Sequence, residues 1–453
     1  MAPPERPPLP PGPYLVVGLA RSGVAAAEAL HARGERVYGT DSGSPPGGGR
    51  LAELGVEVEL DGDGTELLDR VSAVIKSPGV PAEAPVIAAA RAQGMPVIGE
   101  LELGWSLLPN RFVALTGTNG KTTVAEWLGH VWSQAGEPYA VAGNVGTPLA
   151  SLAGELDPDA TVICECSSFQ LEDSVAFAPE VSLLLNVTPD HLDRHGTFAS
   201  YLEAKLRIFA NQRPGATALV DADDPALAAL EIPGGASPAR FGIEGCESGG
   251  CAVWLEGDSL RDAAGPLVEQ EELPLSGEHN LRNAMAVAAA ALAAGIDREA
   301  VASGLRTFGG VPHRLERVAE IGGVCFVNDS KATNVAAAAA ALTAFDGGVH
   351  AILGGSLKGG DFAALAPLVA ERCRACYLIG EAESRLAEDL APAGVPLQRC
   401  GDLAAAVRAA AAAADSGETV LLAPACASFD AFRDYEERGE VFVELVEALG
   451  GAR

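Results

Sequence analysis

The sequence lacks several features that would place it among membrane or nucleic-acid-binding proteins. No apolar run approaches the roughly 20 residues that a membrane-spanning helix requires. Basic residues are scarce, because 31 Lys and Arg stand against 61 Asp and Glu, which gives a formal net charge of −30. Such an excess of negative charge disfavours nonspecific binding to nucleic acid and to anionic membranes. We therefore expect a protein with neither kind of partner, whose acidic residues largely cover a solvated surface.

The cysteines and the N-terminal segment argue against a secreted, disulfide-rich protein. The nine cysteines show no disulfide-scaffold spacing, and the opening MAPPERPPLPPGP lacks the apolar stretch of a signal peptide. We interpret residues 1–13 as a disordered tail, and the protein as cytoplasmic with reduced thiols. The pairs Cys246/Cys251 and Cys373/Cys376 suggest a zinc site, but no further Cys or His completes either pair. Structural or incidental thiols are the favoured interpretation.

The chain is long enough for several domains. It has 453 residues, of which 48% are hydrophobic, so two or three cores are expected. Short apolar runs alternate with helical patterns throughout, which predicts an α/β fold. We expect three domains: a Rossmann-like N-terminal domain (14–108), a central P-loop ATPase-type parallel sheet with helices (109–309) and a Rossmann-like C-terminal domain (310–453).

The stretch FVALTGTNGKTTV, Phe112–Val124, is the most informative part of the sequence. An apolar run leads through a Gly-bearing turn into a helix, so backbone N–H groups would point outward at the helix N-terminus and suit a polyphosphate. Lys121 would pair with the outer phosphates, and the hydroxyl of Thr122 would reach a magnesium ion. Leu115 stands where the eight-residue P-loop pattern needs glycine, so the match is to a shorter variant.

The first predicted unit opens with YLVVGLARSG, Tyr14–Gly23, a strand and a tight turn into a helix. Gly18 and Gly23 match the dinucleotide fingerprint, but Ala20 replaces its middle glycine, where a pyrophosphate would approach the backbone. The motif is therefore weak evidence for NAD. Asp41 ends the second strand, where a carboxylate can meet a ribose or a base edge.

Polar residues follow several predicted strands of the central unit. Asn144, Glu165 and His191 each come after an apolar run, and parallel sheets gather ligands at the carboxyl ends of their strands. Glu165 with Thr122 would supply a carboxylate and a hydroxyl to magnesium. His191, beside two aspartates, points to a second metal site. Lys205 looks like an ordinary helix-surface lysine.

In the third predicted unit, DSKATN (Asp329–Asn334) follows a strand and opens a helix. Thr333 or Asn334 can cap this helix, and Lys331 is well placed to neutralise an anion. Arg314 lies at the presumed domain boundary, from which an arginine can reach a phosphate.

Together these motifs resemble those of the Mur ligases, ATP-dependent amide-forming enzymes of bacterial cell-wall precursor synthesis. The resemblance covers essentially the whole chain past residue 13. It rests on SPGV (77–80), TGTNGKTT (116–123), GNVG (143–146), ECSSFQLE (165–172), NVTPDHLDRHG (186–196), AKLRIF (204–209), GEHNLRNA (277–284), PHRLE (312–316), NDSKATN (328–334) and PACASFDAF (424–432).

The resemblance implies addition of D-glutamate to UDP-N-acetylmuramoyl-L-alanine through an acyl phosphate, with ATP, two Mg²⁺ ions and a carbamylated lysine at Lys205. It implies a monomer that acts on small molecules. The catalytic and metal-binding residues implied are Lys121, Thr122, Glu165, His191 and Lys205. The ATP-binding residues implied are Gly117, Thr118, Asn119, Gly120, Lys121, Thr122, Thr123, Asn280, Asn283, Arg314 and Asp329. The substrate-binding residues implied are Arg21, Ser22, Asp41, Ser42, Ser77, Gly79, Asn144, His191, Lys331, Thr333, Lys358, Ser428, Phe429 and Tyr435.

Three alternatives remain open at this point. A sister ligase or a folate-polyglutamating enzyme with another amino-acid substrate would share TGTNGKTT, although the DNPR-like motif expected of the diamino-acid ligase is absent. An oxidoreductase is disfavoured by Ala20. A nucleotide-sensing module without turnover would have no use for Glu165, His191 and Lys205.

Overall fold

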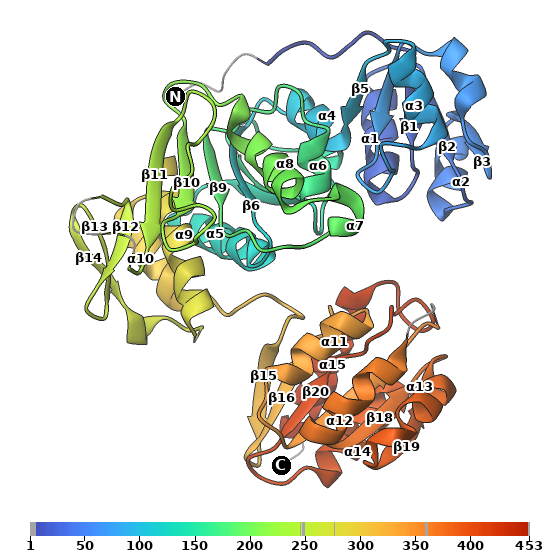
Figure 1. Cartoon of the computed structure of the whole chain (residues 1–453). Coiled ribbons are helices and arrows are strands. Elements are labelled where there is room, and N and C mark those ends of the chain that lie inside the picture. Colours follow the sequence, from blue (N-terminus) through green and yellow to red (C-terminus); the bar gives the residue numbers. More distant parts are fainter. Residues whose placement is uncertain (1–5, 245, 247–249, 276, 358–360, 452–453) are drawn as a thin grey trace. The chain divides into compact units, whose positions relative to one another are not determined.

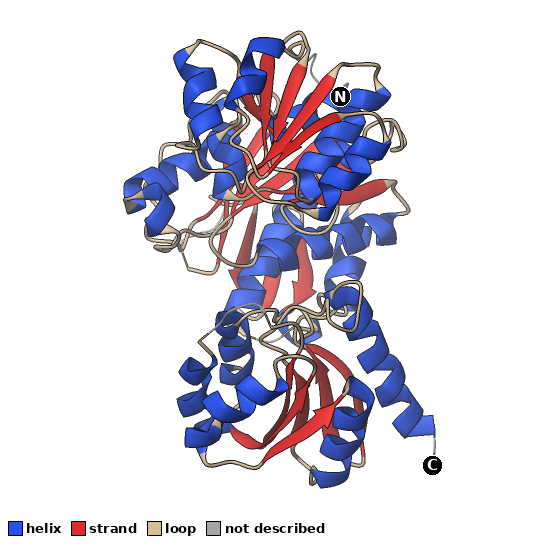
Figure 2. Cartoon of the chain, turned by 90° about the vertical axis from the view of Figure 1, so that its right-hand side faces the viewer, coloured by secondary structure: helices blue, strands red, loops and turns tan. Residues whose placement is uncertain are grey.

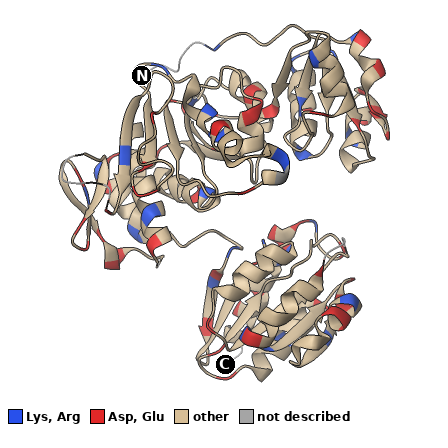
Figure 3. Ribbon diagram, in the orientation of Figure 1, with Lys and Arg blue, Asp and Glu red and all other residues tan. Residues whose placement is uncertain are grey.

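The structure, a computed structural model, describes residues 6–244, 246, 250–275, 277–357 and 361–451. The chain forms two compact units, residues 1–309 and 310–453 (Figure 1). In each unit, helices pack against the faces of mainly parallel sheets (Figure 2). Charged residues of both signs are interspersed over both units (Figure 3). None of the described helices combines the length and the apolar character of a membrane span. The predicted α/β fold is thus confirmed.

The N-terminal sheet has five parallel strands in the order β3-β2-β1-β4-β5. In β1, Tyr14 and Val16 pack into one apolar cluster, whereas Leu15 and Val17 pack into another, so both faces are buried. Burial on both faces explains why this strand is apolar throughout. The elements are β1 (Tyr14–Val17), α1 (Arg21–Ala32), β2 (Val37–Asp41), α2 (Pro46–Glu53), β3 (Glu57–Leu60), η1 (Thr65–Arg70), β4 (Ala73–Lys76), α3 (Pro85–Ala92), β5 (Val97–Gly99) and α4 (Glu100–Leu107).

The central sheet has the order β14-β13-β12-β11-β10-β9-β6-β8-β7. The sheet is parallel from β7 to β12, and Leu115 of β6 pairs with Glu165 of β8. Residues 117–120, which follow β6 and are called the phosphate loop below, therefore lie at the same edge of the sheet as Glu165. Strands β13 and β14 extend this parallel sheet with antiparallel pairing.

The central elements are β6 (Arg111–Thr116), α5 (Lys121–Ala135), β7 (Tyr139–Gly143), η2 (Leu149–Leu152), β8 (Thr161–Glu165), α6 (Ser168–Glu172), β9 (Val181–Leu184), α7 (Leu192–His195), α8 (Phe198–Ala210), β10 (Thr217–Asp221), β11 (Ser237–Gly242), β12 (Val253–Glu256), β13 (Ser259–Asp262), β14 (Gly265–Glu269), η3 (Gln270–Glu272), α9 (Glu278–Ala294) and α10 (Arg298–Thr307).

The second unit is a six-stranded sheet in the order β15-β16-β20-β17-β18-β19, parallel except for β15. Ala351 and Leu353 of β17 face one core and Ile352 faces the other. The elements are β15 (Glu316–Ile321), β16 (Val324–Asn328), α11 (Val335–Thr343), β17 (Val349–Gly354), η4 (Phe362–Leu365), α12 (Ala366–Arg372), β18 (Cys373–Ile379), α13 (Glu383–Asp389), η5 (Ala391–Ala393), β19 (Leu397–Gly401), α14 (Leu403–Ala413), β20 (Thr419–Leu422) and α15 (Tyr435–Gly451).

From Arg6 onward, the segment before β1 packs against the first unit, unlike the disordered tail predicted for residues 1–13, of which residues 1–5 lie outside the described residues. The Arg6 guanidinium lies 4.9 Å from the ring centroid of Trp105 and 5.1 Å from that of Phe112. It donates to the backbone carbonyls of Trp105 and Asn110. An arginine that stacks on two aromatic rings offsets the entropy lost in ordering a proline-rich segment, which composition alone does not reveal.

Two cysteines differ from the prediction of reduced thiols. Cys246 and Cys251 form a disulfide, with their Cα atoms 5.5 Å apart. This separation of the Cα atoms lies within the range that a disulfide requires. No group of three or more metal-ligating His, Cys, Asp or Glu side chains occurs among the described residues, so nothing in them supports a zinc site.

Candidate active site

The phosphate loop lies between β6 and α5. Gly120 has φ +81°, and a Cβ atom there would lie 2.6 Å from Oδ1 of Asn283, so only glycine fits without a shift. The Lys121 ammonium donates to the carbonyls of Gly117 (3.0 Å) and Thr118 (2.8 Å). The lysine therefore lies back over the loop, at the position where the sequence predicted a phosphate-binding cation.

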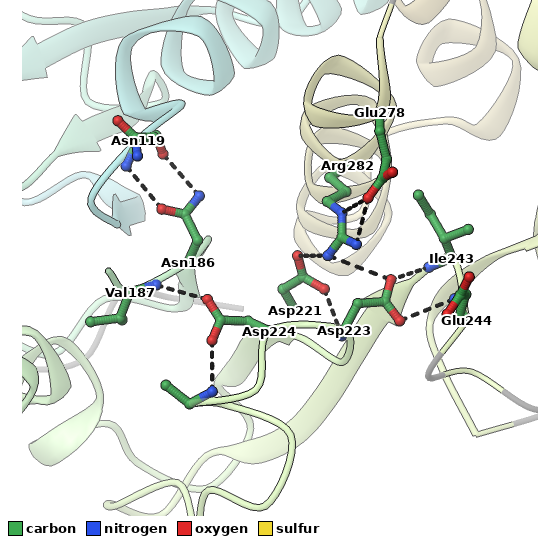
Figure 4. Close-up of polar contacts among 11 residues, drawn as sticks. Asn119, Asn186, Val187, Asp221, Asp223, Asp224, Ile243, Glu244, Glu278 and Arg282 are labelled. Atoms are coloured by element: carbon green, nitrogen blue, oxygen red, sulfur yellow. Dashed lines mark hydrogen bonds and ion pairs between the residues drawn. The ribbon is translucent and has the colours of Figure 1, made fainter. Parts of the chain in front are cut away.

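The loop after β9 holds the phosphate loop in place. The amide of Asn186 accepts from Asn119 N (2.9 Å) and donates to Asn119 O (3.1 Å), as Figure 4 shows. The Thr118 hydroxyl donates to Thr188 O (3.1 Å) and lies 3.1 Å from the hydroxyl of Tyr201. Asn186 and Tyr201 were not predicted as site residues, although Asn186 opens the NVTPDHLDRHG motif. These contacts hold the loop between β6 and α5 in place.

Carboxylates beyond β10 position the same region (Figure 4). Asp224 accepts from the backbone N of Val187 at 2.9 Å. Arg282, on α9, pairs with Asp221 at 3.2 Å and with Glu278 at 2.8 Å, and burial raises the pKa of Asp221. These contacts tie α9, which carries Asn280 and Asn283, to the carboxyl end of β10. The side chain of Asn283 thereby lies against Gly120 of the phosphate loop.

Glu165 ends β8 and is buried, with 2% of its surface exposed. One carboxylate oxygen accepts from Nδ2 of Asn144 at 2.9 Å. Thr122, also buried, opens α5 at the end of the neighbouring strand β6. A carboxylate and a hydroxyl are oxygen ligands of the kind that Mg²⁺ takes through few protein groups together with water and phosphate. The residues present therefore fit a magnesium ion, provided that a polyphosphate supplies further ligands.

Lys205, on α8, is almost completely buried, unlike the surface lysine predicted from the residues alone. Its Nζ donates to Gly117 O at 2.7 Å and lies 4.6 Å from the ring of Tyr201. Burial, and secondly the charge of Lys121, lower the pKa of Lys205 to about 7. A sizeable fraction of its amine is therefore uncharged at neutral pH, next to the phosphate loop.

His191 lies at the start of α7 with φ +50°, and its side chain is half exposed. Its Nε2 lies 3.5 Å from a carboxylate oxygen of Asp190, and its ring centroid is 4.9 Å from that of Phe169. His195 instead contacts the Ser168 hydroxyl at 3.1 Å, and burial lowers its pKa. Of these two histidines, His191 is the more exposed, and its role as a metal ligand stays a prediction.

A cavity of about 790 Å³ borders the loops after β1, β2 and β4. Its lining includes seven predicted substrate residues: Arg21, Ser22, Asp41, Ser42, Ser77, Gly79 and Asn144. Both carboxylate oxygens of Asp41 accept backbone N–H groups, from Leu19 (2.7 Å) and Gly43 (2.9 Å), so Asp41 holds two loops together. Asp61, Asp63 and Gln170, which sequence reasoning missed, also line the cavity.

In the second unit, predicted residues follow β16 and β20. Asp329 is buried and accepts from Leu315 N at 3.1 Å, and burial raises its pKa to about 6. The ammonium of Lys331 lies 5.9 Å from the ring of Tyr435. Ser428 is 1% exposed, and its hydroxyl has no hydrogen-bond partner among the described residues. Phe429 is 62% exposed.

Other predicted residues of this unit are less constrained. Arg314 and Thr333 lie in the loops before β15 and after β16, and Lys358 lies outside the described residues. Sequence reasoning missed Arg438, which is buried. It donates to the Ser330 hydroxyl (2.9 Å) and to Cys426 O (3.1 Å), which joins the loops after β16 and β20. Burial lowers the pKa of Arg438 to about 10.

Three family models match the chain. The model described as "Mur ligase MurD-like, N-terminal domain" matches residues 13–99, "Mur ligase middle domain" matches 115–291, and "Mur ligase, glutamate ligase domain" matches 313–426. Solved structures share the fold. MurC from Thermotoga maritima has a TM-score of 0.57 at 19% identity and covers 96% of this chain and 99% of its own. MurF from Acinetobacter baumannii has a TM-score of 0.55 at 23% identity, covering 82% and 85%.

Curated relatives match at higher identity. The UDP-N-acetylmuramoylalanine–D-glutamate ligase of Acidobacterium capsulatum is 44% identical over 447 residues, which cover 97% of this chain and 96% of the relative. The protein of the same name from Rubrobacter xylanophilus is 45% identical over 446 residues, covering 97% and 98%. Since both relatives and the family models extend over nearly the whole sequence, the chain belongs to the Mur ligase family.

Proposed function

We propose that the chain is an ATP-dependent ligase that joins D-glutamate to UDP-N-acetylmuramoyl-L-alanine during peptidoglycan precursor synthesis, as a monomer in the cytoplasm. The observation that carries the proposal is the similarity over nearly the full length, at 40–45% identity, to relatives with this activity in their name. The buried Glu165 beside the phosphate loop supports a phosphate-transferring ligase over a nucleotide-sensing module.

Each substrate is assigned to one part of the chain. The cavity of residues 14–108 takes the UDP moiety, with Arg21 and Ser42 toward the base and Ser77 and Gly79 toward the pyrophosphate. Residues 109–309 bind ATP through the phosphate loop and, at the adenine, through Asn280 and Asn283. Residues 310–453 bind the amino acid. The lining of the cavity by the six residues that the resemblance implies for the UDP moiety supports the first assignment.

The proposed reaction has two steps. A carboxylate oxygen of the alanyl group attacks the γ-phosphorus of ATP, so that ADP leaves and an acyl phosphate forms. The amine of D-glutamate then attacks the acyl carbon, a proton is lost, and phosphate leaves the tetrahedral intermediate. Lys121 would offset charge on the transferring phosphoryl group, and the phosphate loop would hold it in line. Positioning of this kind can supply on the order of 7–11 kcal/mol of the barrier reduction.

Two magnesium ions are part of the proposal. Thr122 and Glu165 would hold one, and His191 and Lys205 the other. When bound, the ions would neutralise charge on the phosphoryl oxygens. Lys205 would serve as a ligand after its amine adds CO₂ to become a carbamate. The lowered pKa of Lys205 supports this assignment, because the neutral amine is the form that adds CO₂.

The D-glutamate pocket is assigned to Thr333, Lys358, Ser428, Phe429 and Tyr435, with Lys358 and Ser428 toward the carboxylates of the amino acid, while Lys331 faces the substrate. The buried Ser428 hydroxyl supports this assignment, since a buried hydroxyl without a partner is unfavourable until a ligand supplies one. Arg314 and Asp329 would face the ATP phosphates and the substrate.

Phosphate release tests the proposal. The enzyme, ATP, Mg²⁺ and UDP-N-acetylmuramoyl-L-alanine are combined with D-glutamate, L-glutamate, L-alanine or a diamino acid in turn. We expect release only with D-glutamate. Release with another amino acid instead would show a sister ligase, and release without any amino acid would contradict coupled amide formation.

A further inference from the structure

Helix α6 ends in two carboxylates that are held by cations from other parts of the first unit. Asp173, directly after the helix, pairs with Nζ of Lys76 at 2.6 Å, and both side chains are almost completely buried. Arg91, on α3, approaches the other carboxylate oxygen at 3.4 Å. Lys76 ends β4 and Arg91 lies on α3, so both cations come from the N-terminal domain, whereas α6 belongs to the central one.

Arg194, on α7, makes a second bridge to the same helix. One guanidinium nitrogen donates to Pro78 O at 3.1 Å, and the other pairs with Glu172 at 3.1 Å. The guanidinium also lies 4.1 Å from the ring centroid of Phe169. This side chain therefore joins the loop Ser77–Val80 of the N-terminal domain, helix α6, and the short helix that begins beside His191.

These contacts connect the two ends of the proposed substrate site. The loop Ser77–Val80 and Gln170 of α6 both line the nucleotide cavity. Helix α6 starts at Ser168, three residues after Glu165 ends β8, and a capping box between Ser167 and Gln170 fixes this start. A displacement of α6 relative to the loop would therefore change the distance between the cavity and Glu165.

Stability alone does not account for these cations. A buried ion pair is weak evidence for stability, because desolvation offsets much of the attraction. Moreover, Arg207 of α8 already binds the carbonyls of Leu171 and Ser174 at the end of α6. The helix is thus anchored within the central domain without help from Lys76 or Arg194. What these two residues add is a fixed position of the Ser77–Val80 loop relative to helix α6.

We propose that Lys76 and Arg194 are positioning residues, which hold the Ser77–Val80 loop against α6 so that a substrate bound by its nucleotide reaches Glu165 and His191 with its acyl end. Neither residue touches a reacting atom. The inference rests on the proposed function, since it takes the cavity as the UDP site.

Two variants test the proposal. Arg194→Met keeps the length and apolar body of the side chain but removes both bridges. Lys76→Met combined with Asp173→Leu replaces the ion pair by apolar groups and leaves neither partner as a lone buried charge. Arg306→Met is the matched control, because Arg306 also pairs with a carboxylate, Glu272 (2.9 Å), but does not line the cavity. Each is measured for kcat, for KM of ATP, and for calorimetric Kd of UDP and of UDP-N-acetylmuramoyl-L-alanine.

We expect both variants to lower kcat by roughly 10- to 100-fold, as for misplacement of a substrate by about 1 Å. The Kd of UDP and the KM of ATP should stay within about twofold of the wild type, because each half-site remains intact. Arg306→Met should match the wild type in every measurement. Arg194→Lys, which keeps the charge but can make only one of the two bridges, should recover part of kcat.

Two results would overturn the inference. Unchanged kcat in both variants would show that the position of the Ser77–Val80 loop relative to α6 does not affect turnover. A parallel loss of UDP binding, ATP binding and melting temperature would show a merely structural role. If Arg194→Met does not fold, Arg194→Lys takes its place and is judged by the same two results. Failure of the proposed function is distinguishable, since then the wild type itself would neither bind UDP nor turn over the muramoyl substrate.

Discussion

The surroundings of Lys205 lower its pKa and so favour the neutral amine, which is the form that adds CO₂. We therefore expect activity to require a lysine at this position and not only a positive charge. Lys205→Arg keeps a cation but cannot form a carbamate, so we expect it to be inactive in phosphate release. Lys205→Ala should also be inactive, and acetate should restore part of its activity by placing a carboxylate in the vacated space.

The Lys205 series is checked by phosphate release together with melting temperature, which separates lost chemistry from lost folding. Robust activity of a folded Lys205→Arg protein would mean that a cation, and not a carbamate, is needed at this position. Acetate added to the wild type serves as the control and should have no effect.

Asp329 should make stability depend on pH. Its pKa is raised to about 6, so between about pH 4 and pH 6 the folded state keeps a proton that the unfolded state has lost. Stability therefore falls as pH rises through this window, and the penalty is fully present above it. Asp329→Asn, whose amide oxygen can still accept from Leu315, should stabilise by on the order of 2 kcal/mol above this window and far less below it.

Thermal melting of the Asp329→Asn protein and the wild type at about pH 4.5 and about pH 7.5 measures how the stabilisation depends on pH. The two pH values lie toward opposite ends of the titration of Asp329. Asp346→Asn is the control, because the Asp346 side chain is fully exposed, and its effect should be equal at both values. A gain for Asp329→Asn that is larger at the lower pH would contradict the argument. Activity should be lost in any case if Asp329 faces ATP.

Among the secondary-structure elements, the buried strands could be predicted from the sequence, whereas only some of the edge strands, such as β5 and β7, could. Apolar runs such as Val349–Leu353 identify strands that are covered on both faces. Four strands that the patterns did not predict, β3, β14, β15 and β19, lie at sheet edges, and β13 lies beside one. An edge strand such as β3, with sequence EVEL, carries polar residues because part of it meets water.

The residues of the candidate site divide in a similar way, into those that a local sequence pattern predicts and those that it does not. The phosphate loop could be predicted because its chemistry is contained in eight consecutive residues. Asn186, Arg282 and Arg438 could not, because each acts on a partner that lies far away in the sequence, 67 residues for Asn186 with Asn119 and 61 for Arg282 with Asp221. Local patterns carry no information on such pairs.

The turn into α5 can be tested at Gly120. Gly120→Ala places a side chain at φ +81° and within 2.6 Å of Asn283 Oδ1. We expect a loss of roughly 1–3 kcal/mol in unfolding free energy, from strain and from the clash, and a marked rise in KM for ATP. Denaturant unfolding of the chain and ATP kinetics measure the two effects.

Gly136→Ala is the matched control at the other end of the same helix. Gly136 also has positive φ, +68°, but nothing lies within 4 Å of its Cβ position. It should therefore show strain of about 1 kcal/mol and no effect on the KM for ATP. Equal behaviour of the two variants would show that the contact with Asn283 does not matter.

On the scale of the whole molecule, the N-terminal segment should contribute to stability. Removal of residues 1–12 takes away the Arg6 guanidinium, its contacts with two aromatic rings and its hydrogen bonds to two carbonyls. A cation–π contact of this kind is worth about 1–2 kcal/mol where it is partly buried. We expect the melting temperature to fall by on the order of 3 °C.

Arg6→Ala in the full chain should reproduce the part of this fall that comes from the guanidinium contacts. Arg317→Ala is the control, because Arg317 pairs with Glu320 (2.5 Å) on an exposed strand and such pairs contribute little. An unchanged melting temperature after truncation would show that the segment is the disordered tail that its composition predicts.

The cavity that we assign to the UDP moiety has a consequence for inhibition. All of its lining residues belong to residues 1–309, so the cavity is complete within one unit. A small molecule that fills it would not depend on the arrangement of residues 310–453, nor compete with the high cellular concentration of ATP. Its potency should therefore be the same whether or not D-glutamate and ATP are present, and should fall as the UDP-linked substrate is raised, which distinguishes it from inhibitors aimed at the phosphate loop.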